Sequence, residues 1–243
     1  MKFALIGYGK MGRAIEQVIT DQKRGDEIVL RIGEDNLHEL TSDNLKKADV
    51  AIEFTRPDAA IGNINLCFDA GVPVVVGTTA WLDRLSEVKL ACEGKDGGLF
   101  YSPNFSIGVN IFFEINRRLA AIMHHQPQYD VSIEEIHHTE KLDAPSGTAI
   151  RAAEVIMSEY KRKSKWVLAG SQATDAASGL LITAKREPHV PGTHIVTYSS
   201  EVDEIQVIHQ AKTRRGFAEG AVMAARWMAG RKGVYEMKDL LSF

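Results

Sequence analysis

The sequence contains little cysteine and no long apolar run. Its two cysteines, Cys67 and Cys92, form no CxxC pattern and lie in helix-like apolar stretches. We therefore expect both thiols to be buried packing groups rather than redox centres or metal ligands. No segment reaches the ~18 apolar residues that a membrane span needs, and the apolar run before the first glycine is too short for a signal peptide. These absences favour a reducing, cytoplasmic location.

An excess of charge of one sign is also missing. The formal net charge is −3 and no block of lysine and arginine occurs, which argues against nucleic acid or an anionic membrane as the main partner. Hydrophobic residues at 44% and charged residues at 25% are typical of a soluble globular protein. A chain of 243 residues has room for one large domain or two modest ones.

The first hundred residues alternate short apolar runs with helical periodicity. Strands followed repeatedly by helices are typical of a parallel sheet with right-handed crossovers. The expected helices include Pro57–Ala70 and Ala80–Cys92. The expected strands are Phe3–Gly7, Glu27–Ile32, Asp49–Thr55, Pro73–Thr79 and Gly98–Ser102.

The pattern changes after Asn104. Helices and then successive strands indicate an α+β domain with a mixed or antiparallel sheet. The last helix, Gly216–Met228, has an apolar face that could cover the first domain. The other expected elements are helices over Gly108–His124 and Ser146–Lys161 and strands over Asp130–His137, Leu180–Arg186, Thr193–Tyr198 and Glu204–Ala211.

A glycine-rich loop follows the first strand and opens the first helix. In a GxGxxG loop the glycines permit a tight turn, close backbone approach and helix–strand packing, so that a pyrophosphate can lie on the helix N-terminus. Glu34, after the second strand, is suitably placed to accept hydrogen bonds from ribose hydroxyls. A tight turn without a ligand is the alternative, and Lys10 either touches phosphate or is solvated. The loop residues are Gly7, Tyr8, Gly9, Lys10, Met11 and Gly12.

Two further loops lie at the expected carboxyl ends of strands, where open α/β sheets bind ligands. Their small and hydroxyl-bearing residues suit a nicotinamide and its ribose. Ordinary turns with capping threonines are the alternative. The loops are Gly77-Thr78-Thr79 and Ser102-Pro103-Asn104-Phe105.

The densest polar cluster runs from Glu134 to Thr148. Ser146 is a natural helix N-cap, and the free amides beside it, with the helix dipole, make an anion site for a carboxylate. Histidine can deliver a proton near neutral pH. A structural histidine and a metal site for the His137-His138 pair are alternatives, although no HExxH or cysteine set accompanies the pair, and we expect no metal.

Several of these segments together resemble the dihydrodipicolinate reductase family, the 4-hydroxy-tetrahydrodipicolinate reductases of bacterial lysine and diaminopimelate synthesis. EIHHTEKLDAPSGTA (Glu135–Ala149) is the most specific of them. GTTAW in place of the commoner GTTGF is a departure. The remaining segments are GYGKMG, EFTRP (Glu53–Pro57), VVGTT, SPNFSIGVN (Ser102–Asn110) and RRGFAEGAVMAARWM (Arg214–Met228).

The resemblance implies roles for individual residues. His137 falls on the proton donor and acceptor, and Lys141 on a lysine donor. His138, Ser146, Gly147 and Thr148 fall at the substrate site, where Gly147 and Thr148 hold a carboxylate. The loops at Gly7–Gly12, Gly77–Thr79 and Ser102–Phe105, with Glu34, fall on the nucleotide site.

The resemblance also implies an architecture and a cofactor. A Rossmann dinucleotide-binding domain (1–105 and 215–243) would carry an inserted α+β domain (106–214) whose mixed sheet binds substrate and assembles a homotetramer. The cofactor would be NADH or NADPH. Asp35 stands where some members carry a basic residue for the 2′-phosphate, which favours NADH.

Two alternatives stay open. Another small-acid reductase, such as an aspartate dehydrogenase, would share the first domain but would not account for the His-His, Lys and Ser-Gly-Thr cluster. A non-catalytic dinucleotide sensor would need no general acid.

Overall fold

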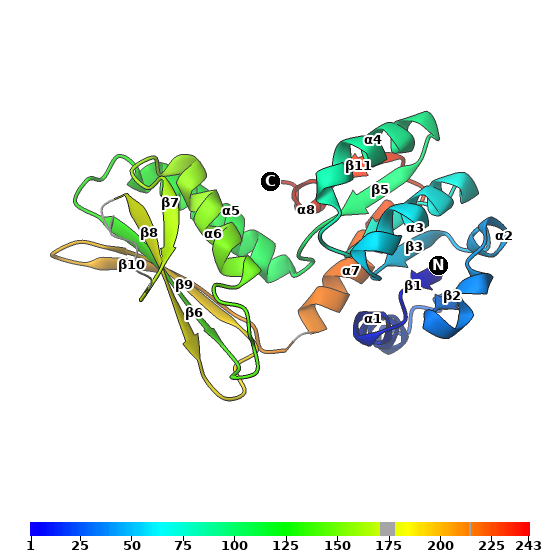
Figure 1. The fold of residues 1–243 in the computed structure, drawn as a ribbon, viewed down its shortest axis with the longest axis horizontal. Helices are drawn as coiled ribbons and strands as arrows, with labels where there is room; N and C mark the ends of the chain where they lie inside the picture. The colour runs from blue at the N-terminus through cyan, green and yellow to red at the C-terminus, as the bar shows by residue number, and fades with distance from the viewer. Residues whose placement is uncertain (171–177, 214) are drawn as a thin grey trace. The chain divides into compact units, whose positions relative to one another are not determined.

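The computed structural model describes residues 1–170, 178–213 and 215–243. Arg214, which opens the last segment of the resemblance, lies outside the described residues. The chain divides into two compact units, one formed by Met1–Ile107 with Arg215–Phe243 and the other by Gly108–Arg214 (Figure 1). None of the helices in the described part of the chain is long and apolar enough to cross a membrane.

Unit 1 is a parallel sheet of six strands in the order β11-β5-β4-β3-β1-β2, an α/β arrangement of the Rossmann type. Its strands are β1 (Lys2–Ile6), β2 (Glu27–Ile32), β3 (Val50–Glu53), β4 (Val74–Val76), β5 (Gly98–Tyr101) and β11 (Gly233–Tyr235). Its helices are α1 (Lys10–Asp21), α2 (Ser42–Leu45), α3 (Pro57–Ala70), α4 (Leu85–Gly94), α7 (Arg215–Met228) and α8 (Met237–Leu241), with short 3₁₀ helices at Glu34–Glu39 and Leu82–Arg84.

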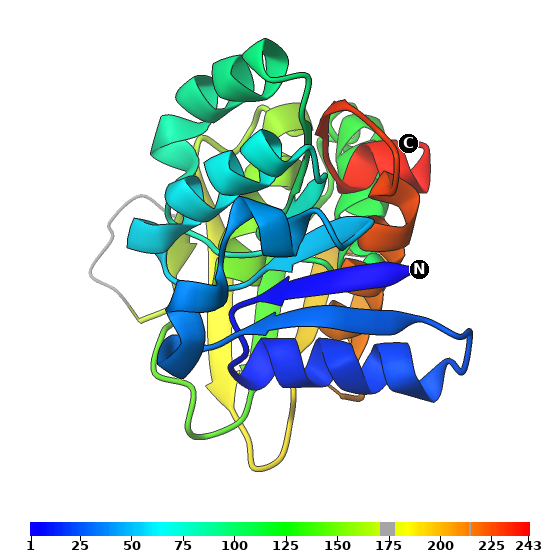
Figure 2. The same ribbon diagram turned by 90° about the vertical axis from the view of Figure 1, so that its right-hand side faces the viewer.

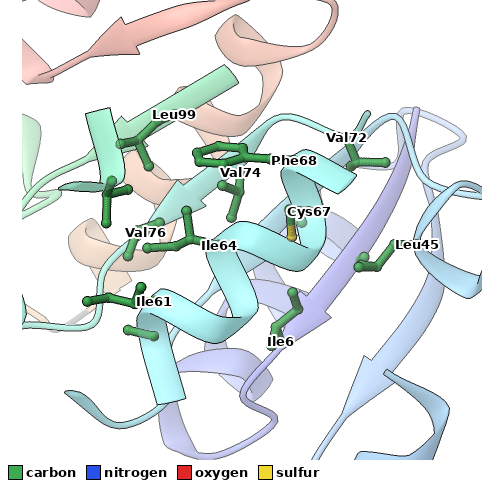
Figure 3. Packing of buried hydrophobic residues seen from close by; sticks show 14 of the residues in the cluster. Ile6, Leu45, Ile61, Ile64, Cys67, Phe68, Val72, Val74, Val76 and Leu99 are labelled. Atoms are coloured by element: carbon green, nitrogen blue, oxygen red, sulfur yellow. The ribbon is translucent and has the colours of Figure 1, made fainter. Parts of the chain in front are cut away.

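The central strands are buried on both faces because helices cover each face of the sheet. Alternate residues of a strand point to opposite faces, so Ile6 packs on the α3 side while Leu5 packs on the α1 and α7 side. On the α3 side, Ile64 and Phe68 pack against Val74 and other strand residues (Figure 3). Cys67 and Cys92 are free thiols buried in the same core, as the sequence predicts.

The C-terminal helix completes unit 1. Ala218, Ala221 and Ala225 of α7 pack beside the α1 residues Ile15 and Val18, on the same sheet face. Figure 2 shows α1, in blue, alongside β1 and β2. Small residues on α7 permit close packing, since a Cβ on Gly220 would lie 1.8 Å from the carbonyl oxygen of Phe105. Helix α7 therefore lies in the same compact unit as α1.

Unit 2 has a mixed sheet of five strands in the order β10-β9-β6-β8-β7. Strand β6 pairs parallel with β8 and antiparallel with β9. Helices α5 and α6 cover one face of this sheet (Figure 1), where their apolar residues form a core with Ile133, Leu180 and Tyr198. The elements are α5 (Ile107–Met123), β6 (Asp130–His137), α6 (Gly147–Glu159), β7 (Lys165–Leu168), β8 (Gly179–Arg186), β9 (Thr193–Ser199) and β10 (Glu204–Gln210).

Two expectations from the sequence need correction. The helix expected over Ala80–Cys92 does not begin at Ala80, whose φ is 62°, and α4 starts only at Leu85 after a 3₁₀ turn. Four short elements, α2, β7, β11 and α8, are not expected from the sequence. They have four, four, three and five residues, too few to show a periodicity.

Candidate active site

In unit 1 the carboxyl ends of four neighbouring strands meet at one edge of the sheet. The strand hydrogen bonding continues into the loops, because Phe54 N donates to Ile6 O (2.8 Å), Gly77 N to Glu53 O (2.9 Å) and Ser102 N to Val76 O (3.2 Å). The strand order reverses at β1, between β2 and β3. Ligands of open α/β sheets bind at such a switch point.

The glycine-rich loop is shaped by contacts that only glycine permits. Gly7 has φ 99°, and a Cβ there would lie 2.0 Å from Phe54 O. A Cβ on Gly12 would lie 2.3 Å from Gly7 O. Gly9, the N-cap of α1, instead borders open space, and no side chain caps this helix start. The loop therefore leaves helix N–H groups available to an anion, which fits a pyrophosphate.

The acidic pair lies beside this loop. Gly7 N and Tyr8 N both donate to Ile32 O, at 2.9 and 2.8 Å, and tie the loop to the end of β2. Glu34 and Asp35 lie just after the end of β2, and both are exposed. Their position next to the glycine loop fits the recognition of a ribose.

The turn after β4 is joined to a buried carboxyl group. Thr78 Oγ1 accepts the N–H of Thr55 at 2.7 Å, so this hydroxyl has a structural partner. Glu53 is fully buried, accepts hydrogen bonds from Thr55 and Asn63, and has its pKa raised by burial. In the described part of the chain, its second oxygen has no hydrogen-bond partner. Thr79 is exposed.

The loop after β5 is a compact turn. Ser102 Oγ accepts the N–H of Asn104 at 3.2 Å, and Asn104 Oδ1 accepts the N–H of Ser106 at 2.9 Å. Phe105 is 2% exposed and stacks on Phe100. Its side chain belongs to the core, so a contact between this residue and a cofactor would come through the backbone. Pro103 is exposed, as is Lys10 in the glycine loop.

In unit 2, His137 ends strand β6 in a buried polar group. Its Nδ1 lies 3.6 Å from Oε2 of Glu135, which is fully buried. His194, on the adjacent strand β9, places Nε2 3.8 Å from the same oxygen. Burial is the main cause that lowers the pKa of His137, and Glu135 opposes it by raising that pKa. Burial also lowers the pKa of His194 to about 3.

Lys141 and its loop are held close to this group. The Lys141 ammonium donates to both carboxylate oxygens of Asp143 at 2.8 Å, and the hydrogen bond lowers the pKa of Asp143. Arg186 donates to the carbonyl oxygens of Lys141 (3.1 Å) and Asp143 (2.6 Å). The charge of Lys141 acts on His137 and lowers its pKa. The half-buried His138 contributes its carbonyl oxygen to the turn, accepting the N–H of Lys141 at 3.1 Å.

The start of α6 has the predicted form. Ser146 is the N-cap, and its Oγ accepts the N–H of Ala149 at 3.1 Å. The amides of Gly147 and Thr148 belong to the first turn, where no intrahelical acceptor exists. The first turn contains no acidic side chain, and a Cβ on Gly147 would meet nothing within 4 Å. An accessible helix start of this kind suits a substrate carboxylate.

The metal alternative that the sequence leaves open concerns the His137-His138 pair, but the group of potential ligands in the structure contains His194 in place of His138. In the described residues, one ligand atom each from Glu135, His137 and His194 lies within 4.8 Å of the others. However, Glu135 already accepts the N–H of Ser146 with both oxygens, and the Arg186 guanidinium lies 3.6 Å from one of them. The arginine supplies the positive charge that a metal would otherwise bring.

Three residues of this group are not among the candidates that the sequence predicts. Glu135 lies within the EIHHTEKLDAPSGTA segment without a role of its own, and no motif contains Arg186 or His194. Little in the sequence marks them as functional, because each is a single polar residue in a strand that is recognised by its alternating apolar residues. Strand pairing joins His137 to Arg186 and Glu135 to His194.

Comparisons with known proteins cover the whole chain. Residues 1–105 match the family described as dihydrodipicolinate reductase, N-terminus, and residues 108–241 match its C-terminus. The chain belongs to the dihydrodipicolinate reductase family. The 4-hydroxy-tetrahydrodipicolinate reductase of Christiangramia forsetii is 45% identical over 243 residues, covering 100% of this chain and 98% of that protein. The protein of the same name from Ralstonia pickettii is 32% identical, covering 95% and 89%.

Solved structures agree on the fold. The dipicolinate-bound dihydrodipicolinate reductase from Paenisporosarcina sp. TG-14 has a TM-score of 0.81 at 23% identity and covers 98% of each chain. An amine dehydrogenase from Mycobacterium smegmatis has a TM-score of 0.60 at 10% identity, covering 96% of this chain and 94% of its own. As a member of this reductase family, the protein is an oxidoreductase that uses a nicotinamide cofactor.

The glycine loop gives a matched pair of variants. Gly7→Ala should lower the free energy of unfolding by more than about 2 kcal/mol, because of its positive φ and the overlap with Phe54. Gly9→Ala should change stability by less than about 1 kcal/mol but weaken NADH binding by at least about tenfold. Urea unfolding and calorimetric titration measure the two effects. Wild-type affinity in Gly9→Ala would contradict the placement of the pyrophosphate.

Proposed function

We propose that the protein is a 4-hydroxy-tetrahydrodipicolinate reductase, which reduces its cyclic dicarboxylate substrate to tetrahydrodipicolinate in the diaminopimelate route of lysine biosynthesis. The observation that carries this proposal is the segment from His137 to Thr148. It holds a histidine acid, a lysine and a helix start suited to a carboxylate, in a chain 45% identical to a relative of that name. Two buried free thiols are consistent with a cytoplasmic location.

The two units supply different parts of the reaction. Unit 1 carries the dinucleotide on the glycine loop and the loops after β4 and β5, and the bound nicotinamide supplies a hydride. In unit 2, Gly147 and Thr148 bind a substrate carboxylate through their amides, with His138 and Ser146 beside them. His137 gives a proton to the reduced ring system, and the Lys141 ammonium supports it. Desolvation keeps the pKa of His137 low, which makes its protonated form a stronger acid.

Removal of either proposed proton-transfer group should abolish most of the activity. We expect His137→Ala and Lys141→Ala to lower kcat by about 10²–10⁴-fold, with NADH binding unchanged because unit 1 is untouched. Substrate-dependent NADH oxidation, with freshly generated substrate, measures the loss. His125→Ala, in the turn that follows α5, is the matched control. No oxidation of either nucleotide by folded, NADH-binding wild type would exclude the reaction and favour a sensor or another reductase.

The acidic turn after β2 supports NADH as the preferred cofactor. Glu34 accepts hydrogen bonds from the ribose hydroxyls, and the adjacent Asp35 adds a second negative charge. Both side chains are exposed beside the glycine loop. A 2′-phosphate would meet these charges at short range and be repelled.

Reversal of one of these charges tests the preference. The wild type should have the higher kcat/KM with NADH. Asp35→Lys should raise kcat/KM for NADPH by about tenfold, or about 1.4 kcal/mol. Asp43→Lys reverses an exposed charge on α2 and should leave the ratio unchanged. A wild type that prefers NADPH would contradict the assignment.

The outer face of the unit 2 sheet supports a homotetramer. Helices α5 and α6 cover the opposite face (Figure 1), and in the described residues no helix of unit 2 packs on this one. Leu181 on β8 and Ile208 on β10 are 45% and 56% exposed. The facing Ile195 adds to this apolar surface, while Glu134 and Lys185 form an ion pair on it at 2.6 Å. A second copy would bury these residues and pair the same charges across a symmetric contact.

Charged substitutions on this face should break the assembly. We expect light scattering to give a mass four times that of one chain for the wild type, and a smaller assembly for the double variant Leu181→Lys with Ile208→Lys. Desolvation of two lysines at such a contact is unfavourable. Leu90→Lys on α4, where the leucine is 71% exposed, should keep the wild-type mass. A monomeric wild type would refute the proposal.

A further inference from the structure

One buried carboxylate has no part in the proposed reaction. Glu135 is 0% exposed, whereas its neighbour Glu134 points to the other face of strand β6 and pairs with Lys185. The effective penalty for removing a carboxylate from water amounts to several kcal/mol unless partners compensate it. The partners of Glu135 therefore indicate what this carboxylate does.

Its partners come from four elements: the start of α6, β8, β9 and its own strand β6. Both oxygens accept the N–H of Ser146 at 3.1 Å, at the start of α6. Oε1 lies 3.6 Å from Nη1 of Arg186 on β8. Oε2 lies 3.6 Å from Nδ1 of His137, on its own strand. His194 Nε2 is 3.8 Å from Oε2 and 3.3 Å from Ser146 Oγ, which closes the group on the β9 side.

Each contact fixes a different part of the proposed substrate site. Ser146 caps the helix start that binds the carboxylate, and Arg186 holds the Lys141 and Asp143 carbonyl oxygens. We infer that Glu135 is a positioning residue that orients the His137 ring. It joins this ring to the start of α6 and, through Arg186, to the Lys141 loop. This inference rests on the proposed function and deepens it.

The geometry also assigns the two ring nitrogens of His137. Nδ1 is buried, faces the carboxylate and has no hydrogen-bond partner among the residues that the structure describes. Nε2 lies on the Gly192 side, where a Cβ would come within 3.1 Å of it. A proton on Nδ1 is favoured by the carboxylate charge. Nε2 is then the nitrogen that transfers a proton, and the absence of a side chain at Gly192 leaves it uncrowded.

Several charged groups face His137, and the positive and negative ones shift its pKa in opposite directions. Lys141 and Arg186 lower its pKa, as burial does, whereas Glu135 and Asp143 raise it. On the β9 and β10 side, His194 has its pKa lowered to about 3, and burial lowers the pKa of His209, so both rings are neutral near pH 7. Loss of the Glu135 charge would therefore lower the pKa of His137 further.

Glu135→Gln tests the inference, because the amide oxygen can still accept the Ser146 N–H while the charge is lost. We expect kcat to fall at least about tenfold, a part of the contribution of the acid, with a smaller change in KM. Since His137 must be protonated to donate, the alkaline limb of the kcat/KM profile should move to lower pH by about one unit. A merely structural role would lower stability without moving this limb.

Two variants and a direct titration complete the test. Glu135→Asp keeps the charge and should return the alkaline limb at least halfway to its wild-type position. Glu140→Gln, which removes an exposed charge from the same loop, should leave the limb in place. Nitrogen-15 NMR of the histidine rings, with His137→Ala for assignment, should show the His137 titration at lower pH in Glu135→Gln.

The NMR titration separates this inference from the proposed function. If the wild type reduces no substrate but the His137 titration still moves, the reaction is wrong and the positioning role stands. An unmoved titration and limb in folded Glu135→Gln would overturn the role. A stoichiometric zinc ion that is lost in Glu135→Gln would also overturn it, in favour of a metal site.

Discussion

The structure depends on a parallel sheet that is buried on both faces. Parallel strands need helical crossovers, and those helices must cover both sides of the sheet. In unit 1 this requirement explains why β1 is almost continuously apolar, since Phe3 and Leu5 pack on one side and Ala4 and Ile6 on the other. It also explains why a helix from the far end of the chain belongs to this unit. Without α7, the face formed by Phe3, Leu5 and Val50 would keep only the part of its cover that α1 provides.

The same sheet creates the ligand site. Because all six strands run in one direction, their carboxyl ends lie at one edge, and the loops with small and polar residues gather there. The glycine contacts at Gly7 and Gly12 draw the first turn against the sheet, while Gly9 borders open space. The shape of this edge comes from backbone packing, and the Thr55 hydroxyl donates to the buried Glu53. The candidate cofactor site is therefore built largely from main-chain atoms.

In unit 2 the candidate site is built from buried charged and polar side chains instead. Mixed strand pairing places Arg186 and His194 on either side of β6, next to Glu135 and His137. A carboxylate, a guanidinium and two histidines lie together in this group. Burial is the main cause that lowers the pKa of both histidines, and within the group Glu135 raises and Arg186 lowers the pKa of His137. Such a group is stable only with its partners in place. The group also joins the His137 ring, the start of α6 and the Lys141 loop, which the proposed reaction needs in fixed relative positions.

Much of this arrangement could be predicted from the sequence. Periodicity located the main strands and long helices, and the string from Glu135 to Ala149 indicated the family because it combines residues that rarely occur together. The N-cap at Ser146 was predictable since capping is a local property. Elements of three to five residues, such as β11 and α8, were missed because they are too short to show a period. The helix start was placed too early, at Ala80, because the positive φ of this residue, which excludes it from a helix, has no signature in the composition.

The order of the main strands and helices, the apolar faces, the glycine loop and the local helix starts follow from the amino-acid sequence, because each depends on neighbours within a few residues. Which distant residues interact through their charges depends instead on the fold. Arg186 lies 51 positions after Glu135 and His194 lies 59 after it, as their numbers give directly. Strand pairing brings them together, and burial then strengthens their interaction with His137 by excluding water. The acidity of the proposed catalytic histidine is accordingly a property of the fold.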